Sequence, residues 1–294
     1  DMAIQMAAKM PKAKLWLRFR HLDDGLSKNL LKKLDDLPDG GHKFLDDFAN
    51  APDEVFKKFI DNPELVEAWK VMDDAKVPQT VKFNADKLTK VNRYLDNNPT
   101  KRDLFIDDLK KTSNPGKFVD RISWKDDLIQ QYGDDIKQFK PQGLHINEVP
   151  QSIIDDMIDA SIAPSELKLT IITEYIKSGS SLPIKKSFNA GDELYKIVPK
   201  GDKVTDFSPY WITKNELNKI RSLENIEQKL GLPLYSFSVE YDVYKIIAQQ
   251  SGNIFESTIA PTLQNGFKTI GGATQSIVPN RNLWSSPLKI ETFL

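Results

Sequence analysis

Between Leu26 and Tyr132, apolar residues recur three and four positions apart, and residues 150–160 and 165–177 continue this pattern. The spacing puts apolar side chains on one side of an α-helix, so each stretch predicts a short amphipathic helix that packs on its neighbours. The residues predicted to share such faces are Leu30, Leu31 and Leu34; Phe44, Leu45 and Phe48; Val55, Phe56, Phe59 and Ile60; Leu65, Trp69 and Met72; Leu88, Val91 and Leu95; and Leu167, Ile171, Ile172 and Tyr175.

The helical pattern stops at residues 178–181, which read Ser-Gly-Ser-Ser and are followed by Leu182 and Pro183. Small side chains offer little surface for packing, so this segment predicts a short flexible connector. We therefore expect two domains. Residues 1–178 would form a helical delivery or linker domain, and residues 183–294 a second domain that carries any activity.

After Pro183, apolar and polar residues alternate, as in half-buried strands. The alternation is clearest at 234–247, and further strands are expected at 194–198, 254–259, 273–278 and 287–293. A helix is expected between the first two strands, since Thr213 and Glu216 have capping-box spacing and Gly231 follows the last apolar position. This order predicts an α+β fold, with a small, mostly antiparallel β-rich module that carries a helical insert.

Composition narrows the chemistry of this 294-residue chain. Its formal net charge of −1 gives no overall field that would attract nucleic acid or anionic lipid, and no apolar run is long enough to predict a membrane span. The first ten residues lack the features of a signal peptide. There is no cysteine, which excludes disulfides and thiolate chemistry. The three histidines, His21, His42 and His145, lie in the helical part without metal-site spacing, so no metal site is expected.

Polar and aromatic residues gather in the predicted loops of the C-terminal module. Tyr210 and Trp211 could hold a base or nicotinamide ring between them, although core packing is the commoner role of such a pair. Gly271 and Gly272 would let a backbone approach a phosphate, but two glycines also make an ordinary turn. Arg281 offers a guanidinium fork for a phosphate, while a lone arginine is more often a surface or structural residue.

Several sequence segments of the module resemble those of a known family. GDELYKIVPKGD, SPYWITKNEL, YDVYKI, FESTIAPT and GGATQSIVPNR are similar to C-terminal toxin domains of bacterial polymorphic (Rhs-like) toxins. NPELVEAWKVMDDA resembles helical segments that precede such domains in large secreted proteins. The order of parts also resembles the fold shared by ADP-ribosyltransferase and NAD glycohydrolase toxins. The resemblance implies NAD as the substrate, without a metal.

The resemblance also implies the roles of individual residues. Tyr195 and Lys196 stand where the family has an aromatic residue and an arginine that bind NAD, and Ser257 and Thr258 match its Ser-Thr strand. Lysine in place of arginine is a departure, because it is a point charge and not a bidentate fork.

Gly271, Gly272 and Gln275 match the glycine-rich turn and glutamine of the glycohydrolases. The acidic pair of protein-modifying transferases is missing after Gln275, which favours NAD hydrolysis or transfer to an unusual acceptor. In this scheme Gln275 orients the nucleophile and Ser257 positions the ribose. Tyr210 or Trp211 stacks on the nicotinamide, and Arg281 joins Lys196 on phosphate.

Two other functions remain open from the sequence. One is a metal-independent ribonuclease toxin, although the module lacks the histidine pair that such enzymes often use. The other is a non-enzymatic protein-binding module. If the toxin resemblance holds, a cognate immunity protein is expected as partner, with a secretion-apparatus or chaperone partner for the N-terminal helices. The protein would be secreted by a bacterium and act in the cytoplasm of a target cell.

Overall fold

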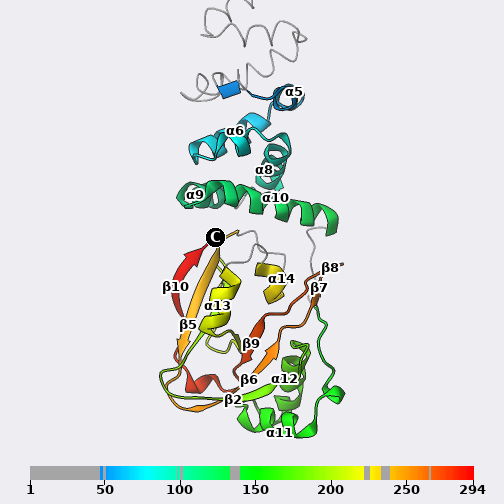
Figure 1. Cartoon of the computed structure of the whole chain (residues 1–294), viewed down its shortest axis with the longest axis vertical. Coiled ribbons are helices and arrows are strands. Elements are labelled where there is room, and N and C mark those ends of the chain that lie inside the picture. The colour runs from blue at the N-terminus through cyan, green and yellow to red at the C-terminus, as the bar shows by residue number, and fades with distance from the viewer. Residues whose placement is uncertain are drawn as a thin grey trace, which may run out of the picture. The chain divides into compact units, whose positions relative to one another are not determined.

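A computed structural model describes residues 47–48, 51–97, 99, 102–132, 140–221, 226–232, 239–264 and 266–294 (Figure 1). The chain divides into two compact units, Asp1–Asp127 and Leu128–Leu294, and the division falls inside helix α10 (Pro115–Tyr132). The first unit is helical where it is described, and the second combines antiparallel sheets with helices. The predicted α+β class is confirmed. The predicted positions Leu30, Leu31, Leu34, Phe44 and Leu45 lie outside the described residues.

In the first unit, the helices bury the predicted faces. They are α5 (Asp53–Asp61), α6 (Leu65–Asp74), α7 (Gln79–Lys82), α8 (Ala85–Asn97) and α9 (Arg102–Lys111), followed by α10. The positions predicted to share faces in α5, α6 and α8 are all buried. Asparagines begin two of the helices, since the Oδ1 atoms of Asn84 and Asn114 accept hydrogen bonds from the backbone N–H groups of Lys87 and Lys117. None of the helices in the described part of the chain is long and apolar enough to cross a membrane.

The described residues of the second unit form three antiparallel sheets. Their strands are β1 (Lys140–Pro141), β2 (Ile184–Phe188), β3 (Glu193–Pro199), β4 (Tyr210–Trp211), β5 (Tyr241–Ile247), β6 (Gly252–Thr258), β7 (Thr262–Gln264), β8 (Phe267–Lys268), β9 (Thr274–Ile277) and β10 (Leu288–Phe293). The strand orders are β2-β6-β9-β4, β10-β5-β3 and β1-β7-β8. A backbone bridge between Tyr195 and Ile212 joins β3 to the end of β4 and so links the first two sheets.

The helical insert forms as predicted. It comprises α13 (Lys214–Arg221) and α14 (Ile226–Leu230), and Thr213 Oγ1 accepts a hydrogen bond from the Glu216 backbone N–H at 3.2 Å. Gly231 ends α14 with a φ of +60°, a left-handed conformation that suits glycine. Leu217, Ile220 and Ile226 pack on β3 and β5 in one core cluster.

Helices α11 (Gln151–Ala160) and α12 (Ser165–Lys177) pack against the sheet and belong to the second unit (Figure 1). Ile172 and Ile176 of α12 share a core cluster with Phe255 and Ile277 of the sheet. The predicted α12 face was partly wrong, because Leu167 is 48% exposed. The compact unit thus begins before the predicted boundary near residue 180. The division of roles between delivery and activity stays a prediction.

Residues 178–181 were predicted to be a flexible connector, but their backbone is fixed to the end of β6. The Ser180 N–H donates to the Thr258 carbonyl oxygen, and the Ala260 N–H donates to the Ser178 carbonyl oxygen. Gly179 approaches the sheet so closely that a Cβ atom there would lie 2.7 Å from Ser257 Oγ. Small residues are needed here because the segment packs closely on the sheet. The same small residues had predicted a flexible connector.

Candidate functional site

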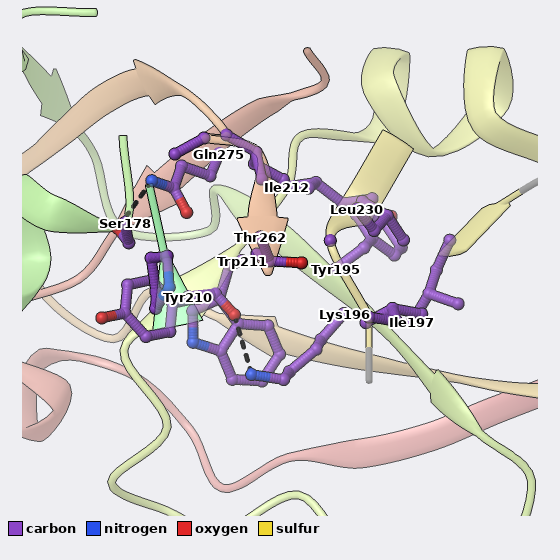
Figure 2. Close-up of a pocket in the computed structure, with 15 residues that line it drawn as sticks. Ser178, Tyr195, Lys196, Ile197, Tyr210, Trp211, Ile212, Leu230, Thr262 and Gln275 are labelled. Atoms are coloured by element: carbon purple, nitrogen blue, oxygen red, sulfur yellow. Dashed lines mark hydrogen bonds between the residues drawn. The ribbon is translucent and has the colours of Figure 1, made fainter. Parts of the chain in front are cut away.

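A cavity of about 240 Å³ opens in the second unit, where the ends of several strands meet (Figure 2). Its wall includes parts of β3, β4, β7 and β9, the end of α14 and the residue after α12. One part of the lining is apolar and comprises Ile197, Ile212, Leu230, Leu232 and Ile259. The polar side chains in the lining are Ser178, Lys196, Tyr210, Thr262 and Gln275, with Tyr195 and Trp211 beside them. A mostly apolar wall with a few polar groups is typical of a small-molecule site.

Gln275 lies on β9 directly opposite Ser257 of β6. Its amide Nε2 donates one hydrogen bond to Ser178 Oγ at 2.8 Å and another to Ser257 Oγ at 3.0 Å. Ser257 therefore lies behind Gln275 and does not itself line the cavity. Gln275 is only 4% exposed, so these contacts fix the orientation of its amide.

The two aromatic residues of β4 differ in their surroundings. Trp211 is buried in a core cluster between the sheets, and its Nε1–H donates to the Ser208 carbonyl oxygen at 2.7 Å. Tyr210 is only partly buried and meets the ring of Tyr175 edge to face, with centroids 5.9 Å apart. Burial raises the pKa of Tyr210 to about 12, against the opposing effect of a hydrogen bond to Ser178. Tyr210 is thus the better placed of the two to meet a ligand ring.

Lys196 extends along the Trp211 ring, with its ammonium 5.9 Å from the ring centroid. Its Nζ donates to Ser208 Oγ at 2.6 Å and to the Tyr210 carbonyl oxygen at 3.2 Å. Burial lowers the pKa of Lys196 to about 8, and the nearby positive charge of Arg281 lowers it further. This lysine holds a positive charge at neutral pH in an environment that disfavours it.

Arg281 approaches the same tryptophan, with its guanidinium carbon 5.2 Å from the ring centroid. Nε donates to the Asp206 carbonyl oxygen and Nη2 to the Ser285 carbonyl oxygen, while Nη1 is buried and has no hydrogen-bond partner among the described residues. Burial lowers the pKa of Arg281, and the negative charge of Asp206 opposes this shift. Within the described ranges, neither Arg281 nor Lys196 forms an ion pair with a carboxylate. Two cations that are largely removed from water and form no ion pair make this region favourable for an anion.

The remaining predicted residues lie away from the cavity lining. Gly271 and Gly272 form the turn before β9 at φ values of +64° and +97°. Their N–H groups donate to the carbonyl oxygens of Gln228 and Ile259, so they are not available to a phosphate. Thr258 donates its backbone N–H to Ser181 Oγ. The cavity therefore brings together Tyr195, Lys196, Tyr210, Trp211 and Gln275. It leaves out Ser257, Thr258, Gly271, Gly272 and Arg281.

Two polar side chains in the lining, those of Ser178 and Thr262, were missed from the sequence. Ser178 was assigned to a linker, and its composition gave no other signal. Thr262 lies in β7 and shares a hydrogen bond with the Thr269 hydroxyl at 2.7 Å. No group of three or more acidic or histidine side chains in the described part of the chain is arranged to hold a metal ion.

No protein-family model and no curated protein matches the chain. Among solved structures, the chain is similar to one described as "Rhs1-CT in complex with cognate immunity protein RhsI1". The sequence identity is 19% and the TM-score 0.30, over 39% of this chain and 86% of that chain.

Proposed function

We propose that the second unit is the toxin module of a secreted bacterial effector and cleaves NAD at the nicotinamide–ribose bond. The observation that carries the proposal is the convergence of Lys196, Tyr210 and Gln275 on one cavity. These residues come from three different strands, β3, β4 and β9. The toxin resemblance of the sequence implies roles for Lys196 and Gln275, and the aromatic character of Tyr210 makes it a candidate for ring stacking.

The size of the cavity favours one half of a dinucleotide. Its volume of about 240 Å³ lies below the roughly 300–1,000 Å³ of common ligand clefts. A nicotinamide ring and its ribose suit this space, and the rest of the molecule would extend outside it. Tyr210 is proposed to stack on the nicotinamide.

The charge of the site supports an anionic substrate. Lys196 and Arg281 lie near each other and form no ion pair with a described carboxylate, and the diphosphate of NAD would bring a negative charge into direct contact with them. Lys196 is the better candidate for direct contact with the diphosphate because it lines the cavity. Arg281 does not line it and would attract the diphosphate electrostatically, without contact. The Trp211 ring, Ser208 Oγ and the Tyr210 carbonyl oxygen hold Lys196 in place.

The proposed chemistry is dissociative. As the bond between ribose C1′ and the nicotinamide nitrogen breaks, its electron pair leaves with the nicotinamide and an oxocarbenium-like centre forms. A water oxygen then bonds to C1′ and releases its proton to solvent, which gives ADP-ribose. No carboxylate is among the described residues that line the cavity, so no general base is assigned. The Gln275 amide would orient the attacking water. Transfer to another acceptor would follow if that acceptor displaced the water.

The test is nicotinamide release from NAD by the purified full-length chain. The proposal predicts release by the wild type and its near-complete loss in Gln275→Ala. The matched control is Gln151→Ala, because Gln151 is an exposed residue of α11 whose amide contacts only Asp155. Absence of release by the wild type would exclude NAD cleavage. A parallel incubation with total RNA would then identify a ribonuclease, and inactivity in both assays would favour a binding module.

The toxin assignment also implies partners. A cognate immunity protein is the expected inhibitor, and the helical first unit is proposed to serve delivery with a secretion-apparatus or chaperone partner. The proposed place of action is the cytoplasm of the target cell. Co-expression of an adjacent immunity candidate, with measurement of growth and nicotinamide release, tests this part.

A further inference from the structure

The side chain of Ser178 joins helix α12 to strand β9 at the cavity. Its hydroxyl donates to the Tyr175 carbonyl oxygen at 2.6 Å and accepts a hydrogen bond from Gln275 Nε2 at 2.8 Å. Because its single proton is used on Tyr175, the hydroxyl can only accept from the amide, which must present nitrogen to it. Ser257 takes the second proton of the same Nε2.

These contacts determine which way the amide oxygen of Gln275 points. With both Nε2 protons bound by serines, Oε1 must lie on the other side of the amide. Figure 2 shows the nitrogen turned to Ser178 and the oxygen turned away from it, toward the other labelled side chains of the cavity. Oε1 accepts no hydrogen bond from the residues that the structure describes.

We propose that Ser178, together with Ser257, is a positioning residue that fixes the Gln275 amide so that Oε1 serves as a hydrogen-bond acceptor for the attacking water. This inference rests on the proposed NAD cleavage and deepens it. A neutral amide oxygen orients water without removing its proton. The proton therefore leaves to solvent only after the water oxygen has bonded to C1′, as the dissociative scheme requires. A glutamine free to rotate would present nitrogen or oxygen and lose this preference.

The position of Ser178 on the backbone supports the assignment. Its carbonyl oxygen accepts from the Ala260 N–H, its N–H donates to the Glu174 carbonyl oxygen, and Gly179 bridges to Ile259. The hydroxyl is thus held from both sides, at the junction of α12 and the sheet. Because the backbone of Ser178 is already fixed, its hydrogen bond to Gln275 can fix the geometry of the reacting group.

The test compares Ser178→Ala, Ser257→Ala and Gln275→Ala in the full-length chain, with Ser180→Ala as the matched control. Ser180 belongs to the same segment, but its exposed hydroxyl has only a long contact with the Thr258 carbonyl oxygen, at 3.4 Å. We expect kcat for nicotinamide release to fall about 10- to 100-fold in Ser178→Ala, with little change in KM, because a misplaced acceptor affects mainly the transition state. Ser178→Thr, which keeps the hydroxyl, should recover most of the rate.

A double variant separates positioning from general support of the fold. If Ser178 acts through Gln275, then Ser178→Ala adds little to the loss already caused by Gln275→Ala. Additive losses, or a Ser178→Ala variant as active as Ser180→Ala, would overturn the inference. An inactive wild type would instead defeat the proposed function itself. Melting temperatures of all variants identify any that fail to fold, and the side-chain amide resonance of Gln275 reports its orientation without NAD.

Discussion

The two units differ in whether their desolvated cationic side chains form ion pairs. In the first, Lys82 is 4% exposed and pairs with Asp73 and, at 3.4 Å, with Asp47. Arg93 pairs with the buried Asp126. In the second, Lys196 and Arg281 have only neutral partners among the described residues. Paired charges are what a stable core requires, whereas unpaired ones reduce stability and persist where a ligand uses them. The contrast supports the proposal that the cavity in the second unit is the functional region.

The largest expected effect is the loss of stability when Lys82 loses its partner Asp73. Asp73→Ala should destabilise the first unit by about 3 kcal/mol, at the low end for a broken buried pair because Asp47 still contacts Lys82. Thermal or urea unfolding of the full-length chain measures this, and nicotinamide release should be unchanged at temperatures where the variant is folded. An unfolding midpoint equal to that of the wild type would mean that this pair does not support the core.

The unpaired cation should behave in the opposite way. Lys196→Met removes a buried charge with no carboxylate partner, so the melting temperature should stay the same or rise. Nicotinamide release should nevertheless fall, with a loss in kcat/KM of about 100-fold, or ~2.7 kcal/mol. Differential scanning fluorimetry and the release assay, run on the same sample, compare the two effects. A clear loss of stability without loss of activity would reverse the interpretation.

A smaller change is expected in the affinity for an anion as the pH is raised. Burial and the charge of Arg281 lower the pKa of Lys196 to about 8, so the ammonium is charged below that pH and increasingly neutral above it. An anion prefers the charged form, and its affinity should therefore fall as pH rises through about 8, by up to roughly tenfold over the next unit or two. ADP-ribose titrations from pH 6.5 to 9.5 measure this. A flat profile, or the same profile in Lys196→Met, would remove Lys196 from the binding site.

The smallest effect is expected for an exposed pair in the second unit. Lys185 and Asp156 lie 2.7 Å apart and are each 44% exposed. Lys185→Ala should change stability by less than about 1 kcal/mol and leave nicotinamide release unchanged. A larger change in either measurement would show that charge removal in this unit acts non-specifically, and would weaken the conclusion from Lys196→Met.

Residues with a periodic pattern were predictable from the sequence, and residues whose role depends on distant partners were not. The faces of α5, α6 and α8 and the strand containing Lys196 follow directly from periodicity. Strand β2 was missed because four of its five residues are exposed, so it lacks an alternating pattern. Ser178 was assigned to a linker, since small residues suit both a loose connector and a close approach to a sheet.

The candidate site was partly predictable for a similar reason. Lys196 and Gln275 stood out through their resemblance to toxin domains and Tyr210 through its aromatic side chain, and all three line one cavity. The Gly271-Gly272 turn stood out equally, yet its N–H groups bond within the chain. Local sequence cannot distinguish a glycine that approaches a ligand from one that approaches its own backbone. At Gly271 a Cβ atom would lie 2.4 Å from the Ile259 carbonyl oxygen.

The central claim is that the unpaired charge at Lys196 marks a binding site for the anionic part of a nicotinamide dinucleotide. Calorimetric titration of ADP-ribose into the full-length wild type and into Lys196→Met at pH 7 tests it most directly. We predict saturable binding by the wild type and at least about tenfold weaker binding by the variant. Equal affinity in the two proteins, or no binding by the wild type, would contradict the claim.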